Sequence, residues 1–261
     1  VPCLNESETL WTCLEKINKA MLVEKEVNYE LIMVDNGSTD NSKEIAIKYN
    51  ATVIEEKEKG YGSALRSGIR FAKGDYIIFA DADDSYDFYD LKKFIQKAKE
   101  GFELINGCRF KKAGGKIEKG AMPFSHQYIG NPLFTFMTKL FFKIKFNDVY
   151  CGFRMFKKSV YEKNFFFSSG MEFAVEHLIK INNSSSKVVE IPITLHKDKR
   201  KKSKSHLNTI IDGFKTLKFL LIYGAQFPLA LITFFSLVLS VVTLNSFILS
   251  DESDYFKNAF Y

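Results

Sequence analysis

Short apolar runs alternate with longer amphipathic stretches from the start of the chain to about Arg109. Apolar residues at every third or fourth position predict helices, whereas short runs rich in Val, Ile and Phe predict buried strands. The predicted helices are Glu8–Val27, Asn41–Tyr49, Ser63–Ala72 and Asp90–Lys99, and the predicted strands are Glu30–Val34, Thr52–Ile54, Asp75–Ala80 and Leu104–Gly107. This alternation is typical of βαβ units, so the sequence predicts an α/β fold with a mainly parallel sheet covered by helices.

A different pattern begins after residue 205. Apolar side chains at helical spacing in residues 206–223 predict an amphipathic helix that lies in a membrane interface. Residues 224–250 contain no charged side chain, and about 20 apolar residues with a rise of about 1.5 Å each are enough to cross a hydrocarbon core. We therefore expect at least one transmembrane helix in 224–250, with a buried helix of a soluble domain as the alternative.

Basic residues are concentrated in one short block. The chain has 37 Lys and Arg against 31 Asp and Glu, a net charge of +6, and Lys197–Lys204 holds six basic residues against one acid. Nucleic-acid-binding proteins usually spread their cations over a face, so we expect no nucleic-acid partner. Residues 197–205 are predicted to be a polybasic linker, either close to anionic lipid or simply solvated. Because basic residues precede the apolar stretch and acids follow it, the main domain is predicted to be cytoplasmic.

Two clusters of acidic residues follow two of the predicted strands. Asp35 and Asp40 come after one strand, and Asp81, Asp83 and Asp84 come after another. If both strands belong to one sheet, the clusters face the same crevice at the carboxyl ends of the strands. A pair spaced like Asp81 and Asp83 is suited to a hard divalent cation such as Mg²⁺ or Mn²⁺. A solvated acidic loop rich in turn formers would explain the same residues, and the pair alone does not decide.

A series of motif-like segments occurs along the chain. The longer segments are Pro2–Glu6, Val34–Asp40, Gly60–Gly68 and Gly74–Asp87, and the shorter ones are Gly107–Phe110, Gly120–Pro123, Ile129–Pro132, Cys151–Arg154 and Gly170–Phe173. In order and spacing this series resembles the family-2 glycosyltransferases, above all the branch of dolichol-phosphate mannose synthases and bacterial polyprenyl-phosphate glycosyltransferases. The resemblance extends from Val1 to about Tyr223. It implies a GT-A fold that binds a nucleotide-diphosphate sugar and inverts the anomeric centre.

The resemblance also implies roles for single residues. The nucleoside pocket would be lined by Pro2, Asn5, Glu6, Asp35 and Asn36. Asp81 would contact the donor, and Asp83 would hold the metal on its diphosphate, with both carboxylates near the ion. The chain departs from the pattern at Asn36, where the family often has a second Asp, and at Ser85, where dolichol-phosphate mannose synthases often carry Gln.

The acceptor decides which other side chains the reaction needs. A phosphate monoester has a second pKa of about 6 and is already largely dianionic at pH 7, so it needs positioning by cations. Arg109 and Arg154 are our candidates for that task, because a guanidinium binds phosphate oxygens in a bidentate way. Ordinary ion pairing with an acid such as Asp148 is the alternative. A sugar hydroxyl would instead need a general base, for which Glu172 is the candidate.

The expected organisation follows from these patterns. It comprises a GT-A domain in 1–196, the linker 197–205, the interfacial helix 206–223, the transmembrane segment 224–250 and an acidic and aromatic tail in 251–261. The first residues resemble the end of a strand, so we expect the opening strand to be missing. The predicted function is a membrane-anchored, inverting transfer of a sugar to a polyprenyl phosphate. A hydroxyl acceptor and a catalytically silent membrane scaffold remain as alternatives.

Overall fold

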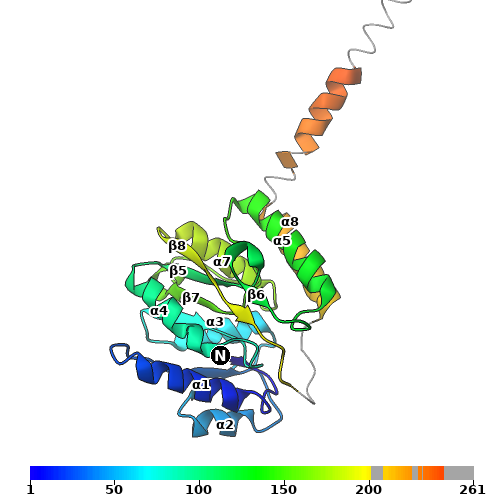
Figure 1. The fold of residues 1–261 in the computed structure, drawn as a ribbon. Coiled ribbons are helices and arrows are strands. Elements are labelled where there is room, and N and C mark those ends of the chain that lie inside the picture. Colours follow the sequence, from blue (N-terminus) through cyan, green and yellow to red (C-terminus); the bar gives the residue numbers. More distant parts are fainter. Residues whose placement is uncertain (201–207, 225–228, 231, 244–261) are drawn as a thin grey trace, which may run out of the picture. The chain divides into compact units, whose positions relative to one another are not determined.

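The computed structural model describes residues 1–200, 208–224, 229–230 and 232–243 (Figure 1). The chain forms two units, Val1–Lys218 and Phe219–Tyr261. The first unit holds every strand that the described residues form. It therefore contains the whole of the predicted α/β domain.

Two hydrogen-bonded sheets and a short ribbon form the centre of the first unit. The first sheet is parallel and has the order β1-β2-β3, with β1 at Pro2–Cys3, β2 at Ile32–Asp35 and β3 at Thr52–Glu55. The second has the order β4-β7-β5-β8, from Tyr76–Phe79, Arg154–Lys157, Leu104–Cys108 and Val188–Pro192. The ribbon pairs β6, Lys116–Ile117, with β9, Thr194–Leu195, in parallel.

The predicted parallel arrangement is confirmed except at one strand. Strand β7 runs antiparallel to both β4 and β5, whereas β5 and β8 are parallel. Its sequence carries no sign of this direction, because a buried strand is equally apolar whichever way it runs. The two acidic clusters follow β2 and β4, which belong to different hydrogen-bonded sheets. The premise that both strands lie in one hydrogen-bonded sheet was therefore wrong.

The predicted helices are present with slightly different ends: three are shorter, and the third along the chain begins two residues earlier than predicted. They are α1 (Leu10–Val23), α2 (Ser42–Lys48), α3 (Tyr61–Phe71) and α4 (Leu91–Lys99). Later helices are α5 (Asn131–Phe142), α6 (Lys158–Tyr161), α7 (Phe173–Ser184) and α8 (Thr209–Tyr223), and single-turn elements lie at Phe88–Asp90, Lys111–Ala113 and His126–Gly130. Figure 1 shows α1 and α2 at one end of the unit and α5 beside α8 at another.

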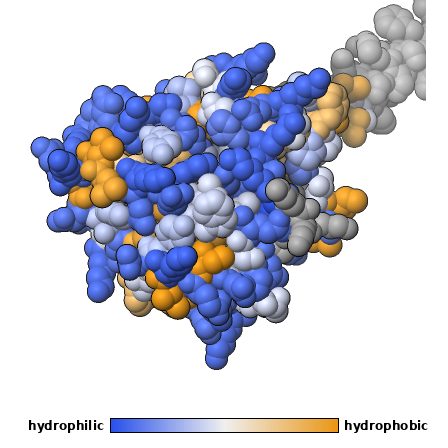
Figure 2. All heavy atoms as spheres, turned by 60° about the horizontal axis from the view of Figure 1, so that its bottom comes forward, coloured by the Kyte–Doolittle hydropathy of each residue, from blue (hydrophilic) through white to orange (hydrophobic). Residues whose placement is uncertain are grey.

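Aromatic side chains fill the core between the second sheet and its helices. Phe153 of the segment before β7 packs against Phe88 and Phe94, and Phe156 of β7 packs against Phe79. All of these rings are buried. The face drawn in Figure 2 is by contrast mostly hydrophilic, with small separate apolar patches. Much of the abundant phenylalanine therefore serves the core, as expected for large apolar side chains.

The membrane segments are only partly described. Helix α8 confirms the predicted helix within residues 208–223, and its exposed side chains include Ile210, Ile211 and Phe214. In the second unit, residues 232–243 are helical with exposed apolar side chains. Among the described residues, no helix has both the length and the apolar character needed to cross a bilayer. The predicted span 224–250 falls partly on 225–228, 231 and 244–250, and the tail 251–261 falls wholly, outside the described residues.

Candidate active site

The carboxylates of Asp81 and Asp83 lie in the loop that follows β4. The half-buried phenol of Tyr61 lies close enough to Asp81 to hydrogen-bond to its carboxylate. A Cβ atom at Gly152 would overlap the Asp81 carboxylate, so this close approach requires glycine. Asp83 accepts a hydrogen bond from the backbone N–H of Ser85 at 3.0 Å through Oδ1. Both carboxylates are half-buried, and each is held by a different neighbour.

The electrostatics of this pair suit a bound cation. Burial, followed by the negative charge of Asp83, raises the pKa of Asp81 to about 6. A cation placed between the two groups would relieve this repulsion. The described residues hold no cluster of three or more side chains with metal-ligating chemistry. The two carboxylates therefore fit Mg²⁺ or Mn²⁺ that takes its other ligands from phosphate oxygens and water.

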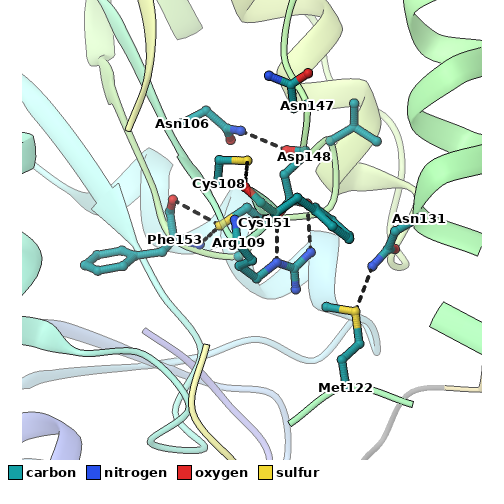
Figure 3. A network of polar contacts seen from close by, with 12 residues as sticks. Asn106, Cys108, Arg109, Met122, Asn131, Asn147, Asp148, Cys151 and Phe153 are labelled. Atoms are coloured by element: carbon teal, nitrogen blue, oxygen red, sulfur yellow. Dashed lines mark hydrogen bonds and ion pairs between the residues drawn. The ribbon is translucent and has the colours of Figure 1, made fainter. Parts of the chain in front are cut away.

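Arg109 lies at the wall of the same site and is paired with Asp148 (Figure 3). Its Nε donates to Asp148 Oδ2 at 2.7 Å and its Nη2 to Asp148 Oδ1 at 2.8 Å, and its backbone N–H donates to the same carboxylate. Ion pairing with Asp148, the alternative to phosphate binding, is therefore present. The two functions are compatible, because no other described residue accepts a hydrogen bond from Nη1.

The structure corrects the assignment of Arg154 as a phosphate ligand. Its side chain is fully buried at the start of β7. Nε donates to Asn106 at 2.8 Å, Nη1 donates to the Ala174 carbonyl and to His177 Nδ1, and Nη2 donates to the carbonyls of Val149 and Cys151. Each nitrogen of the guanidinium is engaged inside the domain. Arg154 is therefore a structural residue with no donor left for a substrate.

The predicted nucleoside-pocket residues gather at the ends of β1 and β2. Asp35 accepts hydrogen bonds from Gly37 and Ser38 and pairs with Lys43 at 3.4 Å. Asn36 donates to the carbonyls of Glu56 and Glu58 and accepts from Gly60 N–H. Asn5 has a φ of 54° and accepts a hydrogen bond from Thr39 N–H at 2.7 Å. The polar groups of Asn5, Asp35 and Asn36 thus make hydrogen bonds within and between neighbouring loops. Pro2 lines a separate apolar cavity of about 360 Å³.

Arg200 is a residue of the site that the sequence reasoning missed. Its Nη1 lies 2.9 Å from Glu6 Oε1 and its Nη2 lies 3.7 Å from Asp83 Oδ2. Lys199, next to it, pairs with Asp84 at 2.6 Å. We had placed both residues in a lipid-facing or solvated linker because they belong to a basic block. The block begins two residues after β9, a strand that the sequence analysis does not predict, so no sequence signal placed it near the acidic loop.

A cavity of about 790 Å³ opens from the acidic loop. Its polar part includes Asp81, Asp83, Arg109, His126, Asp198 and Arg200, and its apolar part includes Met122, Ile129, Phe134, Ile210, Phe214 and Leu217. The apolar part comes largely from α5, the turn before it and α8. His126 Nε2 lies 2.9 Å from Thr209 Oγ1, so the turn and α8 are joined across the cavity. The site therefore combines a charged end with an apolar wall.

Glu172, the candidate base for a hydroxyl acceptor, does not line this cavity. It stands at the N-terminus of α7, and its Oε1 accepts a hydrogen bond from Gly170 N–H at 3.1 Å. Glu176, one turn later, is fully buried and accepts from Phe167 and Ser168. These contacts fix the N-terminal end of α7 within the domain. They give the hydroxyl alternative no support.

Solved structures with the same arrangement define the fold. Glucosyl-3-phosphoglycerate synthase from Mycobacterium tuberculosis in complex with Mn²⁺, uridine-diphosphate and glucosyl-3-phosphoglycerate superposes with a TM-score of 0.64 at 18% identity, over 84% of this chain and 76% of that one. The same enzyme with Mn²⁺ and uridine-diphosphate-glucose gives a TM-score of 0.63 at 17% identity. The α/β architecture is therefore a GT-A fold.

Sequence comparison defines the family. Residues 1–165 match glycosyl transferase family 2. The chain is 34% identical over 223 residues to the low-salt glycan biosynthesis hexosyltransferase Agl6 of Haloferax volcanii, and 33% identical over 218 residues to dolichol-phosphate mannosyltransferase of Pyrococcus furiosus. The alignments cover 85% and 81% of this chain but only 52% and 60% of those two proteins. The chain belongs to glycosyl transferase family 2.

Proposed function

We propose that the chain transfers a sugar, with inversion, from a nucleotide-diphosphate sugar to a polyprenyl phosphate at a membrane surface. The observation that carries this proposal is the cavity of about 790 Å³, in which Asp81, Asp83 and Arg109 share one space with the apolar side chains of α5 and α8. A polyprenyl phosphate has the same two parts, an anionic head and an apolar tail. A saccharide acceptor would need polar walls in place of the apolar one.

The residues near the charged end have separate tasks in this reaction. Asp81 and Asp83 hold a divalent cation, which supplies a Lewis acid that offsets the charge of the departing nucleoside diphosphate. Glu6, Asn5, Asp35 and Asn36 belong to the nucleoside side of the site, whereas Pro2 lines the separate apolar cavity. Arg109 directs Nη1 toward the acceptor phosphate while Asp148 fixes its orientation. Since the acceptor is already dianionic near pH 7, the proposed reaction requires no base.

Membrane attachment is part of the same proposal. Exposed apolar side chains on α5 and on the first unit's part of α8, among them Leu133, Phe136, Ile210 and Phe214, would lie in the lipid interface. The apolar stretch 224–250 would anchor the enzyme in the bilayer. Basic residues before that stretch and acids after it place the catalytic domain on the cytoplasmic side in this proposal.

The test is a transfer assay with the full-length protein in mixed lipid. The donors are a panel of radiolabelled UDP- and GDP-sugars, the acceptor is polyprenyl phosphate, and Mg²⁺ or Mn²⁺ is present. The readout is label in the organic phase. We expect metal-dependent label with one of the donors and its loss, by at least about a hundredfold, in Asp83→Asn, since one carboxylate of the metal pair is gone.

Asp87→Asn is the matched control for this assay. Asp87 lies in the same loop, and its side chain accepts a hydrogen bond from Tyr89 N–H, which Asn can also accept. We expect this variant to retain wild-type transfer. Equal activity of Asp83→Asn and wild type would contradict the metal assignment. Label that appears only when saccharides are added would contradict the lipid-phosphate acceptor and favour a hydroxyl.

A further inference from the structure

A short strap from Asp198 to Arg200 lies against the acidic loop. Its backbone is attached through Lys199 N–H, which donates to the Asp83 carbonyl at 3.3 Å. Lys199 Nζ pairs with Asp84 Oδ2 at 2.6 Å, and the other oxygen of Asp84 pairs with Lys16 at the same distance. The strap is therefore fixed one residue before Arg200, so the guanidinium of Arg200 stays beside the loop.

Three carboxylates surround the Arg200 guanidinium. They belong to Glu6, Asp83 and Asp198, and the Arg200 side chain is only 8% exposed. Each of these acids comes from a different part of the fold: the turn after β1, the loop after β4 and the strap itself. One positive charge thus offsets part of the negative charge that the donor site concentrates. A group in this position has the charge and the place of a bound cation.

The two oxygens of Asp83 are used differently. Oδ1 accepts the hydrogen bond from Ser85 N–H at 3.0 Å, whereas Oδ2 faces Arg200 Nη2 at 3.7 Å. A metal ion that binds Asp83 through its available oxygen would meet the guanidinium there. Two cations at one carboxylate oxygen repel each other strongly, since their interaction varies as the inverse of distance and dielectric constant. Asp83 therefore holds a metal ion less tightly while the Arg200 guanidinium stays in this position.

We propose that Arg200 is a resident counter-ion at Asp83 that the divalent cation has to displace. Arg200 then keeps the acidic site neutralised before the metal arrives, and the attachment of Lys199 keeps it within reach while the guanidinium turns away. Metal affinity in the absence of substrate is lowered by this competition. The inference rests on the proposed function in one respect, which is that Asp83 is the metal ligand.

Mn²⁺ binding without nucleotide tests the competition directly. Mn²⁺ alone is titrated into the full-length protein, and the free ion is followed by electron paramagnetic resonance. Arg200→Gln should bind Mn²⁺ at least about fivefold more tightly than wild type, the lower end of typical coupling between competing ligands. Arg200→Lys, which keeps the charge but loses the planar fork, should fall between the two. Circular dichroism confirms that each variant is folded.

Lys197→Gln is the control for general electrostatics. It removes one positive charge from the same segment, and Lys197 forms no ion pair with Asp83 in the described part of the chain. We expect its Mn²⁺ affinity to stay within about twofold of wild type at 0.15 M salt, where screening acts over about 8 Å. An equal gain in Lys197→Gln and Arg200→Gln, or no gain in either, overturns the counter-ion role.

Asp83→Asn separates this inference from the proposed function. If wild type and Arg200→Gln bind Mn²⁺ equally well and Asp83→Asn abolishes binding, the metal site stands and the counter-ion role fails. If Asp83→Asn leaves Mn²⁺ binding intact in both backgrounds, the metal assignment fails and the counter-ion role fails with it. Tighter binding in Arg200→Gln that is lost in the double variant Asp83→Asn, Arg200→Gln supports both.

Discussion

The cavity wall around Arg109 and the interior around Arg154 use the same side chain for different purposes. Arg109 pairs through Nε and Nη2 with one carboxylate, that of Asp148 (Figure 3), and its side chain lines the cavity. Arg154 distributes its donors among neutral acceptors that come from three parts of the chain. Burial opposes the charged form and lowers the pKa of Arg154 to about 10, so it still carries its charge at neutral pH.

The difference shows what decides whether a buried arginine is available to a substrate. Two nitrogens of the Arg109 guanidinium donate to one carboxylate. All three nitrogens of the Arg154 guanidinium donate to groups inside the domain. The first arrangement orients a cation toward a ligand. The second links strand β7 to the start of α7 and to the loop before β7. Activity should therefore depend on the first residue and stability on the second.

The largest effect is expected from Arg154→Met. This change leaves Asn106, His177 and several buried carbonyls without their donor, which should lower the free energy of unfolding by about 3–5 kcal/mol. Urea denaturation of the full chain measures this loss in the free energy of unfolding. Lys157→Met is the matched control, because Lys157 also lies in β7. Its side chain is 43% exposed, and its Nζ pairs with Glu103 Oε1 at the long distance of 4.0 Å. That variant should stay within about 0.5 kcal/mol of wild type. If Arg154→Met lowered the free energy of unfolding by less than about 1 kcal/mol, the structural role of Arg154 would be contradicted.

The next effect concerns the acceptor. Arg109→Lys keeps a positive charge beside Asp148 but loses the planar fork of the guanidinium. We expect KM for polyprenyl phosphate to rise at least about tenfold, which corresponds to about 1.4 kcal/mol, while KM for the donor changes little. Steady-state kinetics with each substrate varied in turn measures both. An equal rise in the two KM values would point to a general loss of structure instead.

The smallest effect is a pH dependence in the interior region. Burial, followed by the positive charge of Arg154, holds the pKa of His177 well below its usual value of about 6.5. Below pH 6.5 the unfolded chain binds a proton that the folded chain refuses, so stability falls as the pH falls. Between pH 7.5 and pH 5.5 this residue should cost about 1.4 kcal/mol.

His177→Asn isolates that contribution. Asn can accept the hydrogen bond that Arg154 donates to Nδ1, but it does not titrate. Denaturation at the two pH values should show a smaller fall in stability for the variant than for wild type, and the difference between the two falls is the part due to His177. Identical falls would mean that His177 takes up its proton in the folded protein.

The sequence predicted the order of helices and strands and the acidic loop after β4 because both depend on local patterns. Asp81 and Asp83 directly follow a strand, so their position is fixed by that strand alone. The antiparallel direction of β7, and with it the burial of Arg154, depends on tertiary pairing that leaves no local pattern. Arg109 and Arg154 both belong to short motifs made of Gly, Cys, Arg and Phe, Gly107–Phe110 and Cys151–Arg154, and only the folded chain separates their functions.

Arg200 is a second residue whose contacts could not be predicted from local sequence patterns. A run of basic residues before an apolar stretch is typical of a lipid-facing segment, and the charge pattern gave no reason to divide it. The structure places Lys199 and Arg200 beside acids from two distant segments, the turn after β1 and the loop after β4, which is long-range information. Asn5 and Asn36 lie in the loops after β1 and β2, where their hydrogen bonds serve the loops themselves, and their contact with the nucleoside stays a prediction.

The central claim is that the cavity holds the phosphate of a lipid acceptor through Arg109. The most direct measurement is competition of a fixed polyprenyl phosphate substrate with the polyprenol of equal length, in wild type and Arg109→Lys. The account predicts that wild type is inhibited by polyprenol at least about fiftyfold less effectively than by a non-reactive polyprenyl phosphonate, since charge-assisted contacts select the head group. In Arg109→Lys the two inhibitors should differ by no more than about fivefold. Equal discrimination by both enzymes would contradict the claim.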